Sequence, residues 1–299
     1  RSLVGTRKFY KKVLLVAVPI MIQNGITNFV SLLDNIMVGQ VGTEQMSGVA
    51  IANQLVFIFN LCIFGAVAGA GILGAQFYGS GNSEGVRDTF RFKLLFGVIL
   101  SAIFAVIFLT VGEPLIQQFI HQGEGIGDLE ATRSYGKAYL EVIVIGILPF
   151  ALTQCYSGTL RETGETVIPM IAGIIAVLVN LVFNYILIFG KLGAPELGCV
   201  GAAIATVLSR FVELAIVAGW THKHVARNPF IRGALRSFKI PGSLLKQIIA
   251  IGLPLFINEL MWSFGITFMT QCYSVRGLEV VAAFNIANTI SNVFNVVFL

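Results

Sequence analysis

The 299-residue chain is 56% hydrophobic and only 12% charged, whereas soluble domains average about 25% charged residues. So few charges cannot cover a water-soluble globule of this length. The charged residues lie mostly between apolar segments, so the net charge of +5 indicates membrane topology rather than a nucleic-acid partner. In lipid the backbone must satisfy its own hydrogen bonds. The apolar runs are long and continuous, which predicts an all-α, polytopic membrane protein.

Eight segments are apolar and long enough, at roughly 20 residues or more, to cross a bilayer. They lie at about 13–36, 48–78, 92–111, 138–158, 166–189, 198–220, 247–271 and 280–299. Fifteen Lys and Arg residues fall at the N-terminus and after the even-numbered segments, against four on the opposite side. The positive-inside rule then predicts a cytoplasmic N-terminus in a multi-pass protein of the cell membrane.

Two parts of the chain resemble each other. Pro19 in VLLVAVPIMIQ and Pro254 in IIAIGLPLFIN occupy similar contexts, and the same register aligns IAN at 51–53 with IAN at 286–288. Six spans separate the copies, so both begin on the same side of the membrane, as in the parallel repeats of many secondary transporters. We expect a fragment with eight spans of a twelve-span protein. It would comprise a six-helix lobe (1–222), a basic cytoplasmic linker (223–246) and the first two helices of a second lobe (247–299).

The first span carries polar residues on one helical face: Gln23, Thr27, Ser31 and Asp34. A carboxylate at membrane depth costs about 2.5–3.5 kcal/mol on insertion scales, so an ionisable residue there is a functional candidate. The first three are candidates to line a substrate cavity, and Asp34 is a candidate to bind a cation. Alternatively, Asp34 lies near the outer end of its helix and reaches the interface.

Amide and hydroxyl groups recur in the fifth and sixth spans. Asn180 and Asn184 share one helical face, and Thr206 lies in the next span. Such residues also serve as structural hydrogen bonds between membrane helices. Arg210 and Glu213, three residues apart, can pair with each other, and we interpret them as mostly structural.

The seventh span places Glu259 about twelve residues in, which is roughly 18 Å deep and near the bilayer centre. A cation on helices beyond this chain is the alternative partner for that acid. Asn258, Trp262 and Ser263 lie nearby as further cavity candidates. The Trp262 ring can offer a π-face to a cationic ligand, although packing is the more common role.

Several motifs resemble the multidrug and toxic compound extrusion (MATE) transporters. They are DNIMVG at 34–39, LRETGET at 160–166, NLVFNYILIFG at 180–190 and LGCVGAAIATVLSR at 197–210. The resemblance implies two six-helix lobes and cation-coupled antiport of amphipathic, often cationic compounds by a monomer in the lipid bilayer. It needs no cofactor beyond the coupling ion, Na⁺ or H⁺.

The resemblance also assigns roles. Asp34, Asn180, Asn184 and Thr206 match the first-lobe cation site, which would hold Na⁺ if it holds a metal, and Glu259 matches an acid used for Na⁺ in the second lobe. One subgroup has an acid at the position of Asn184, and this departure argues against assignment to a purely proton-driven subgroup. The resemblance does not decide between Na⁺ and H⁺ as the coupling ion.

Two other functions compete with this one. A lipid-linked saccharide flippase of the same superfamily would need a cationic cavity, and the first-lobe spans offer Arg210 as the sole candidate for a buried cation. A membrane-embedded enzyme would need a catalytic constellation. No histidine falls in a span and no GxSxG, HExxH or P-loop motif occurs, so no enzymatic activity is expected.

Overall fold

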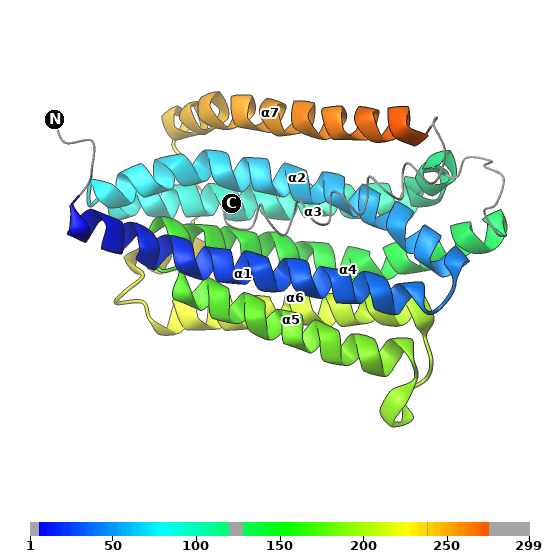
Figure 1. The fold of residues 1–299 in the computed structure, drawn as a ribbon. Coiled ribbons are helices and arrows are strands. Elements are labelled where there is room, and N and C mark those ends of the chain that lie inside the picture. The colour runs from blue at the N-terminus through cyan, green and yellow to red at the C-terminus, as the bar shows by residue number, and fades with distance from the viewer. Residues whose placement is uncertain (1–5, 120–127, 238, 275–299) are drawn as a thin grey trace.

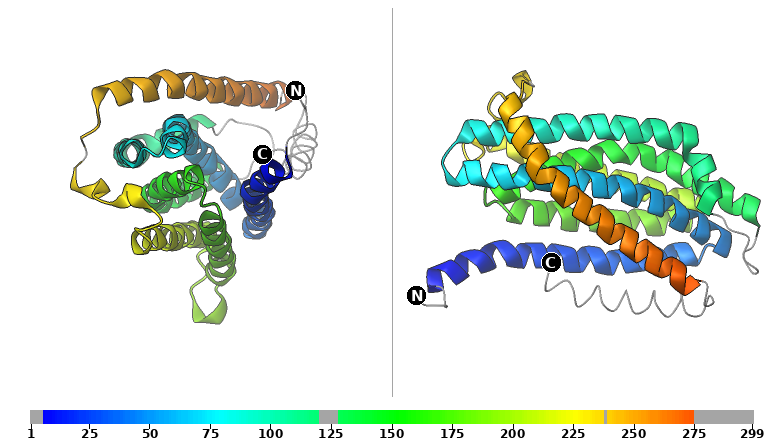
Figure 2. Two further views of the ribbon diagram at one scale, coloured as in Figure 1. Left: turned by 90° about the vertical axis from the view of Figure 1, so that its left-hand side faces the viewer. Right: turned by 90° about the horizontal axis from the view of Figure 1, so that it is seen from above.

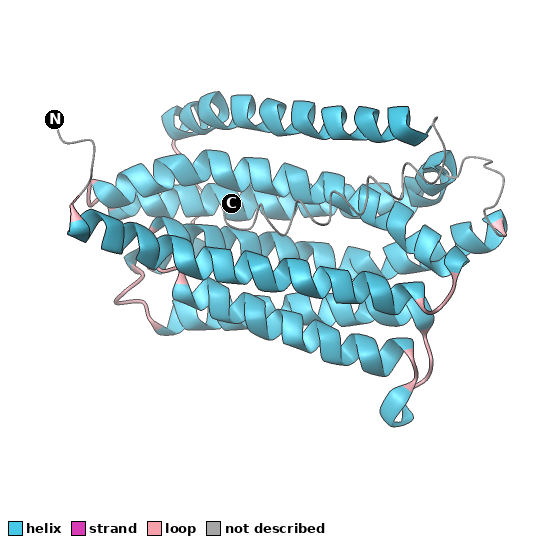
Figure 3. Cartoon of the chain, viewed as in Figure 1, coloured by secondary structure: helices cyan, strands magenta, loops and turns pink. Residues whose placement is uncertain are grey.

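A computed structural model describes residues 6–119, 128–237 and 239–274, and across these residues the chain is helical without any strand (Figure 3). The long helices are α1 (Arg7–Gly39), α2 (Thr43–Gly79), α3 (Ser83–Phe119), α4 (Leu129–Glu162), α5 (Val167–Ile188), α6 (Gly198–Lys223) and α7 (Gly242–Ser274). Three short 3-10 turns, η1 (Lys191–Gly193), η2 (Pro229–Ile231) and η3 (Ala234–Arg236), lie in the connections. The predicted all-α membrane fold is confirmed.

Six of the first seven predicted spans fall within one of these helices, and the fifth, 166–189, matches α5 to within one residue at each end. Five of the described helices, α2 to α6, contain stretches long and apolar enough to cross a membrane, and α1 and α7 contain the shorter apolar stretches Ala17–Ile26 and Gly242–Asn258. Most helices run several residues past the predicted spans because hydrogen-bonded turns continue into the polar ends. The eighth predicted span, 280–299, lies outside the described residues.

The bundle is organised around α2 and α4, which pack closely against each other (Figure 1). Helix α3 covers one side of this pair, while α5 and α6 pack together on the other side and α1 lies along α5. Helix α7 lies outside the six-helix group and crosses α2 (Figure 2). Fully buried Phe59 of α2 meets Phe104 of α3 edge-to-face at 5.4 Å between ring centroids. Aromatic packing of this kind fills the centre of the bundle.

Glycines permit the closest helix contacts. A Cβ atom on Gly48 of α2 would lie 2.7 Å from the carbonyl oxygen of Thr132 and 2.8 Å from the amide nitrogen of Gly136, both in α4. A Cβ atom on Gly69 of α2 would lie 2.5 Å from the Cα of Gly252 in α7. Small residues at such positions let membrane helices approach backbone to backbone, and they bring α2 against both α4 and α7.

The connection between α6 and α7 is folded against the bundle. Phe230 is buried and meets Phe90 of α3 at 5.3 Å between ring centroids. Arg91 of α3 donates from Nε to the carbonyl of Ala234 at 3.0 Å and from Nη2 to the carbonyl of Gly233 at 2.7 Å. This segment, expected as a basic linker, is therefore anchored to α3 by an aromatic contact and two charge-assisted hydrogen bonds. The division into two lobes remains a prediction.

We expect Gly48→Ala to lower the midpoint of thermal unfolding in detergent. Its methyl group would overlap backbone atoms of α4, and overpacking typically costs about 1–3 kcal/mol. The matched control is Gly219→Ala in α6, where a Cβ meets nothing within 4 Å. That change should stabilise the helix by up to about 1 kcal/mol. Equal shifts for both variants would contradict the close approach of α2 and α4.

Candidate functional site

Asn180, Asn184 and Thr206 come together inside the bundle. Asn184 is 1% exposed and donates from Nδ2 to Oδ1 of Asn180 at 3.2 Å. Asn180 donates from Nδ2 to Oγ1 of Thr206 at 3.3 Å, and the Thr206 hydroxyl donates to the carbonyl of Ala202 at 2.9 Å. The structure thus joins the three residues predicted from two separate spans into one buried amide–hydroxyl cluster between α5 and α6.

The polar face of α1 is described in part. Gln23 accepts a hydrogen bond at Oε1 from Nη2 of Arg161 in α4, at 2.9 Å. It lies against Gly173 of α5, where a Cβ would be 2.5 Å from Nε2 of Gln23. Gln23 therefore sits where α1, α4 and α5 meet. The side chains of Thr27, Ser31 and Asp34 lie outside the described residues, although their helix packs along α5.

The candidates on α7 are placed differently. Trp262 is 61% exposed, and Asn258 is also exposed. Neither lines the cavities bordered by Cys62, Tyr78 or Asn60. The side chains of Glu259 and Ser263 lie outside the described residues. The structure therefore leaves Asn258 and Trp262 exposed, and the roles of all four α7 candidates stay predictions.

A cavity of about 570 Å³ opens between α2 and α4. Its lining is mostly apolar and includes two aromatic side chains, Phe64 and Phe150. The polar lining residues are Asn60, Gln154, Arg161 and Glu162. A concave, largely apolar pocket with a few convergent polar groups is the usual form of a small-molecule site. None of these residues was a predicted cavity candidate.

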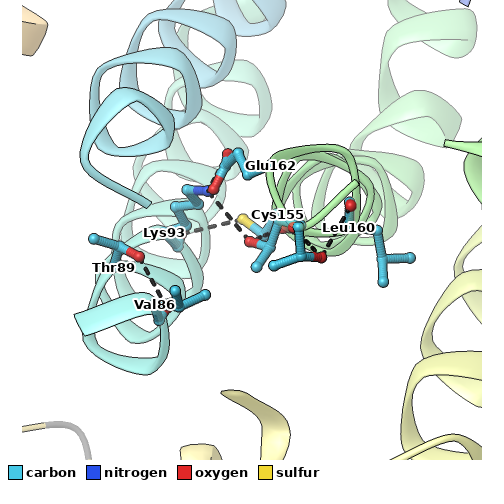
Figure 4. A network of polar contacts seen from close by, with 8 residues as sticks. Val86, Thr89, Lys93, Cys155, Leu160 and Glu162 are labelled. Carbon is cyan, nitrogen blue, oxygen red and sulfur yellow. Dashed lines mark hydrogen bonds and ion pairs between the residues drawn. The ribbon is translucent and has the colours of Figure 1, made fainter. Parts of the chain in front are cut away.

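Glu162, one of the residues that line this cavity, belongs to a buried ion pair (Figure 4). Lys93 of α3 is fully buried, and its Nζ lies 2.5 Å and 2.6 Å from the two carboxylate oxygens of Glu162, which is 12% exposed. Nζ also donates to Oγ1 of Thr159 at 3.2 Å, and the Cys155 thiol donates to the backbone carbonyl of Lys93 at 3.2 Å. The pair and its neighbours join α3 to α4 at one end of the bundle.

Two glycines of α2 make room for the carboxylate. A Cβ on Gly71 would lie 2.6 Å from Oε1 of Glu162, and a Cβ on Gly74 would come closer still to Oε2. Thr89 of α3, whose hydroxyl donates to the carbonyl of Val86 at 2.8 Å, also borders Gly74. The Glu162 carboxylate is therefore held between Lys93 and the bare backbone of α2.

The structure corrects one part of the topology prediction. The prediction places Arg87, Arg91 and Lys93 in the loop after the second span, yet all three lie in α3, and Lys93 is buried in the bundle. The expectation of Arg210 as the sole buried cation was wrong for the same reason. The sequence could have indicated this burial, because Lys93 is flanked by Phe92, Leu94 and Leu95. A lysine in a loop usually has polar neighbours.

Two arginines also enter the interior. The Cζ of Arg210 in α6 lies 5.1 Å from the ring centroid of Phe150, a cation–π contact. Nη1 of Arg210 and Nε of Arg161 are buried without a hydrogen-bond partner. Glu213 interacts electrostatically with both, but among the described residues no ion pair joins Glu213 to either arginine, so the spacing that allows Arg210 and Glu213 to pair does not produce a direct contact.

Lys93→Met is expected to destabilise the protein by about 3–5 kcal/mol, because it leaves a buried carboxylate without its partner. Lys93→Met combined with Glu162→Met should recover most of that loss, since no charge is then left unpaired. Lys137→Met is the control, because Lys137 makes an exposed pair with Glu113 at 2.7 Å and should change stability little. Thermal unfolding in detergent measures all three, and a double variant no more stable than Lys93→Met would refute the pairing.

Comparison with known proteins places this fold. The family model MatE matches residues 19–186. The probable multidrug resistance protein NorM of Thermotoga maritima is 31% identical over 279 residues, which is 92% of this chain and 57% of that protein. The multidrug resistance protein MdtK of Edwardsiella ictaluri is 27% identical over 250 residues, covering 82% of this chain and 52% of that protein. The chain thus spans little more than half the length of these relatives.

Solved structures agree in fold. An outward-facing multidrug resistance MATE transporter of the MOP superfamily superimposes with a TM-score of 0.84 at 24% identity, covering 96% of this chain and 61% of that one. A MOP superfamily transporter from Pyrococcus furiosus, described by the reverse polarity of its binding pocket, superimposes with a TM-score of 0.78 at 25% identity over the same shares. With more than half of the chain matched by the family model, this multi-pass membrane protein belongs to the MatE family, a family of transporters rather than enzymes.

Proposed function

We propose that the protein containing this chain is a cation-coupled antiporter that exports amphipathic organic compounds across the cell membrane. Relatives that carry the name multidrug resistance protein support export as the activity. The observation that carries the proposal is the buried cluster of Asn180, Asn184 and Thr206. Polar groups at this depth are costly in a membrane helix and mark ion or substrate pathways.

The chemistry of the cluster suits a small hard cation. Amide and hydroxyl oxygens are the ligands that such cations prefer. Asp34 on α1, the helix that packs along α5, would complete the site with the negative charge needed to hold Na⁺ or a proton. We assign Glu259 of α7 as a second cation site, in the second lobe, and the N-terminus to the cytoplasm.

Coupling requires that the cation bind the two access states unequally. A ligand shifts a conformational equilibrium only by the difference in its affinity for the two states. Loading of the Asp34 site would favour the state that releases substrate outward. Since Asn180 and Asn184 lie on α5 and Thr206 on α6, cation binding would act on how these two helices pack against α1.

Asp34→Asn is expected to abolish gradient-driven efflux of a fluorescent substrate from vesicles, because the site loses its charge. Asn184→Ala should weaken efflux by removing one oxygen ligand. Glu130→Gln, on the exposed first turn of α4, is the control and should transport normally. Full activity in both Asp34→Asn and Glu259→Gln would refute the proposed coupling sites.

The coupling ion can be identified by imposing one gradient at a time. Vesicles given only an inward Na⁺ gradient, and vesicles given only a pH gradient, are compared for substrate export. We expect one of the two gradients to drive export and Asp34→Asn to remove that response. Equal export with neither gradient imposed would show that transport is not cation-coupled.

A lipid-linked saccharide flippase is the second candidate, and one observation favours it. Such a protein needs a cationic cavity for phosphate, and the interior of the bundle holds Lys93, Arg161 and Arg210 rather than one cation. Lys93 is neutralised by Glu162, so the cationic character rests on the arginines. Transport of a lipid-linked phosphate rather than a soluble compound would distinguish this function.

A further inference from the structure

The cavity between α2 and α4 has an uneven charge balance. Both carboxylate oxygens of Glu162 are within 2.6 Å of Lys93 Nζ, and the carboxylate backs onto the α2 glycines. Glu162 therefore has little capacity left to receive a cationic ligand. The neighbouring Arg161 lines the same cavity and forms no ion pair with any acid in the described ranges.

The Arg161 guanidinium has N–H donors that make no hydrogen bond among the described residues. A guanidinium carries five N–H donors, and the described contacts use Nη2, which donates to Gln23 at 2.9 Å, while Nε is buried without a partner. Among the described residues, Glu213 is the acid that interacts electrostatically with Arg161, and it interacts with Arg210 as well. Two guanidiniums therefore face one described carboxylate, while Lys93 is paired with Glu162. A buried charge without a counterion is costly.

A second polar atom at the cavity also lacks a partner. Oδ1 of Asn60 in α2 is buried without a hydrogen bond, and Asn60 lines the cavity together with Arg161. Phe64, Phe150 and several small apolar residues line the same cavity. The cavity therefore combines a guanidinium that forms no ion pair among the described residues with an apolar wall.

We propose that this cavity binds amphipathic organic anions, whose carboxylate, sulfonate or phosphate pairs with Arg161. Guanidinium and such acids form short, two-pronged hydrogen bonds. The apolar body of the ligand packs on Phe64 and Phe150, which line the same cavity. The volume of about 570 Å³ suits a drug-sized molecule. The inference rests on the proposed function and specifies the cargo class.

Three matched probes test it: pyrene carrying a butanoate, a butanamide or a butyl-trimethylammonium group. Binding to the detergent-solubilised protein is measured by isothermal titration calorimetry against protein-free detergent. The butanoate should bind roughly tenfold more tightly than the butanamide, as expected for a hydrogen bond to a charged group. The trimethylammonium probe should bind most weakly.

Arg161→Gln should lower butanoate affinity roughly tenfold and leave butanamide affinity unchanged, because only the charged contact is lost. Arg161→Lys should retain part of the preference. Arg133→Gln is the control, since Arg133 forms ion pairs with Glu113 and Glu130 away from the cavity. Wild-type butanoate affinity in Arg161→Gln, or trimethylammonium binding as tight as butanoate, would overturn the inference. If Arg161→Gln does not fold, the wild-type ranking of the three probes decides.

A prenyl phosphate competitor separates the two sources of such an acid. Displacement of the butanoate by prenyl phosphate at lower concentration than by free pyrenebutanoate would assign the site to a lipid phosphate, and the reverse order to a soluble amphiphile. Gradient-driven export of a cationic dye with no preference for the anionic probe would overturn this inference while leaving the proposed function intact. Anion binding without any gradient-driven export would sink the proposed function instead.

Discussion

The buried ion pair between Lys93 and Glu162 ties three helices of the bundle together. It joins α3 to the end of α4 and presses the carboxylate onto α2 at Gly71 and Gly74. Replacing one residue of such a pair lowers the stability far more than replacing both with apolar residues. Because Glu162 is fixed in this way, the adjacent Arg161 is held at the cavity wall, where it reaches Gln23 of α1.

This arrangement separates two polar regions with different chemistry. The amide–hydroxyl cluster of Asn180, Asn184 and Thr206 offers uncharged oxygen and nitrogen atoms between α5 and α6. The cavity between α2 and α4 presents a guanidinium instead. Helix α1 is common to both regions, because it packs along α5 and its Gln23 bonds to Arg161. A cation held on α1 and a ligand held at Arg161 would thus act on the same helix, and the two sites would be coupled if both bias one two-state equilibrium of that helix.

Much of the architecture was predictable because lipid imposes strong rules on sequence. The helices α1 to α7 were recognised from continuous apolar stretches, and the cluster around Asn180 followed from helical spacing together with the family resemblance. The cavity was not predictable in the same way. Phe64, Phe150 and Gln154 look like ordinary residues of membrane helices, and only their meeting across α2 and α4 makes them a lining. The positions of Arg91 and Lys93 were misjudged because charge near a helix end was taken to mean a loop.

The amino-acid sequence by itself determined that the chain is a multi-pass helical membrane protein of the MatE type. Hydrophobic length and the absence of water in the bilayer leave a helix as the form that satisfies the backbone. Tertiary structure decided which charges are neutralised and which are not. Whether Lys93 meets Glu162, and whether Arg161 keeps free donors beside a cavity, depends on contacts between residues 66 or more positions apart. Such distances are set by helix packing and glycine contacts, which local sequence pattern does not encode.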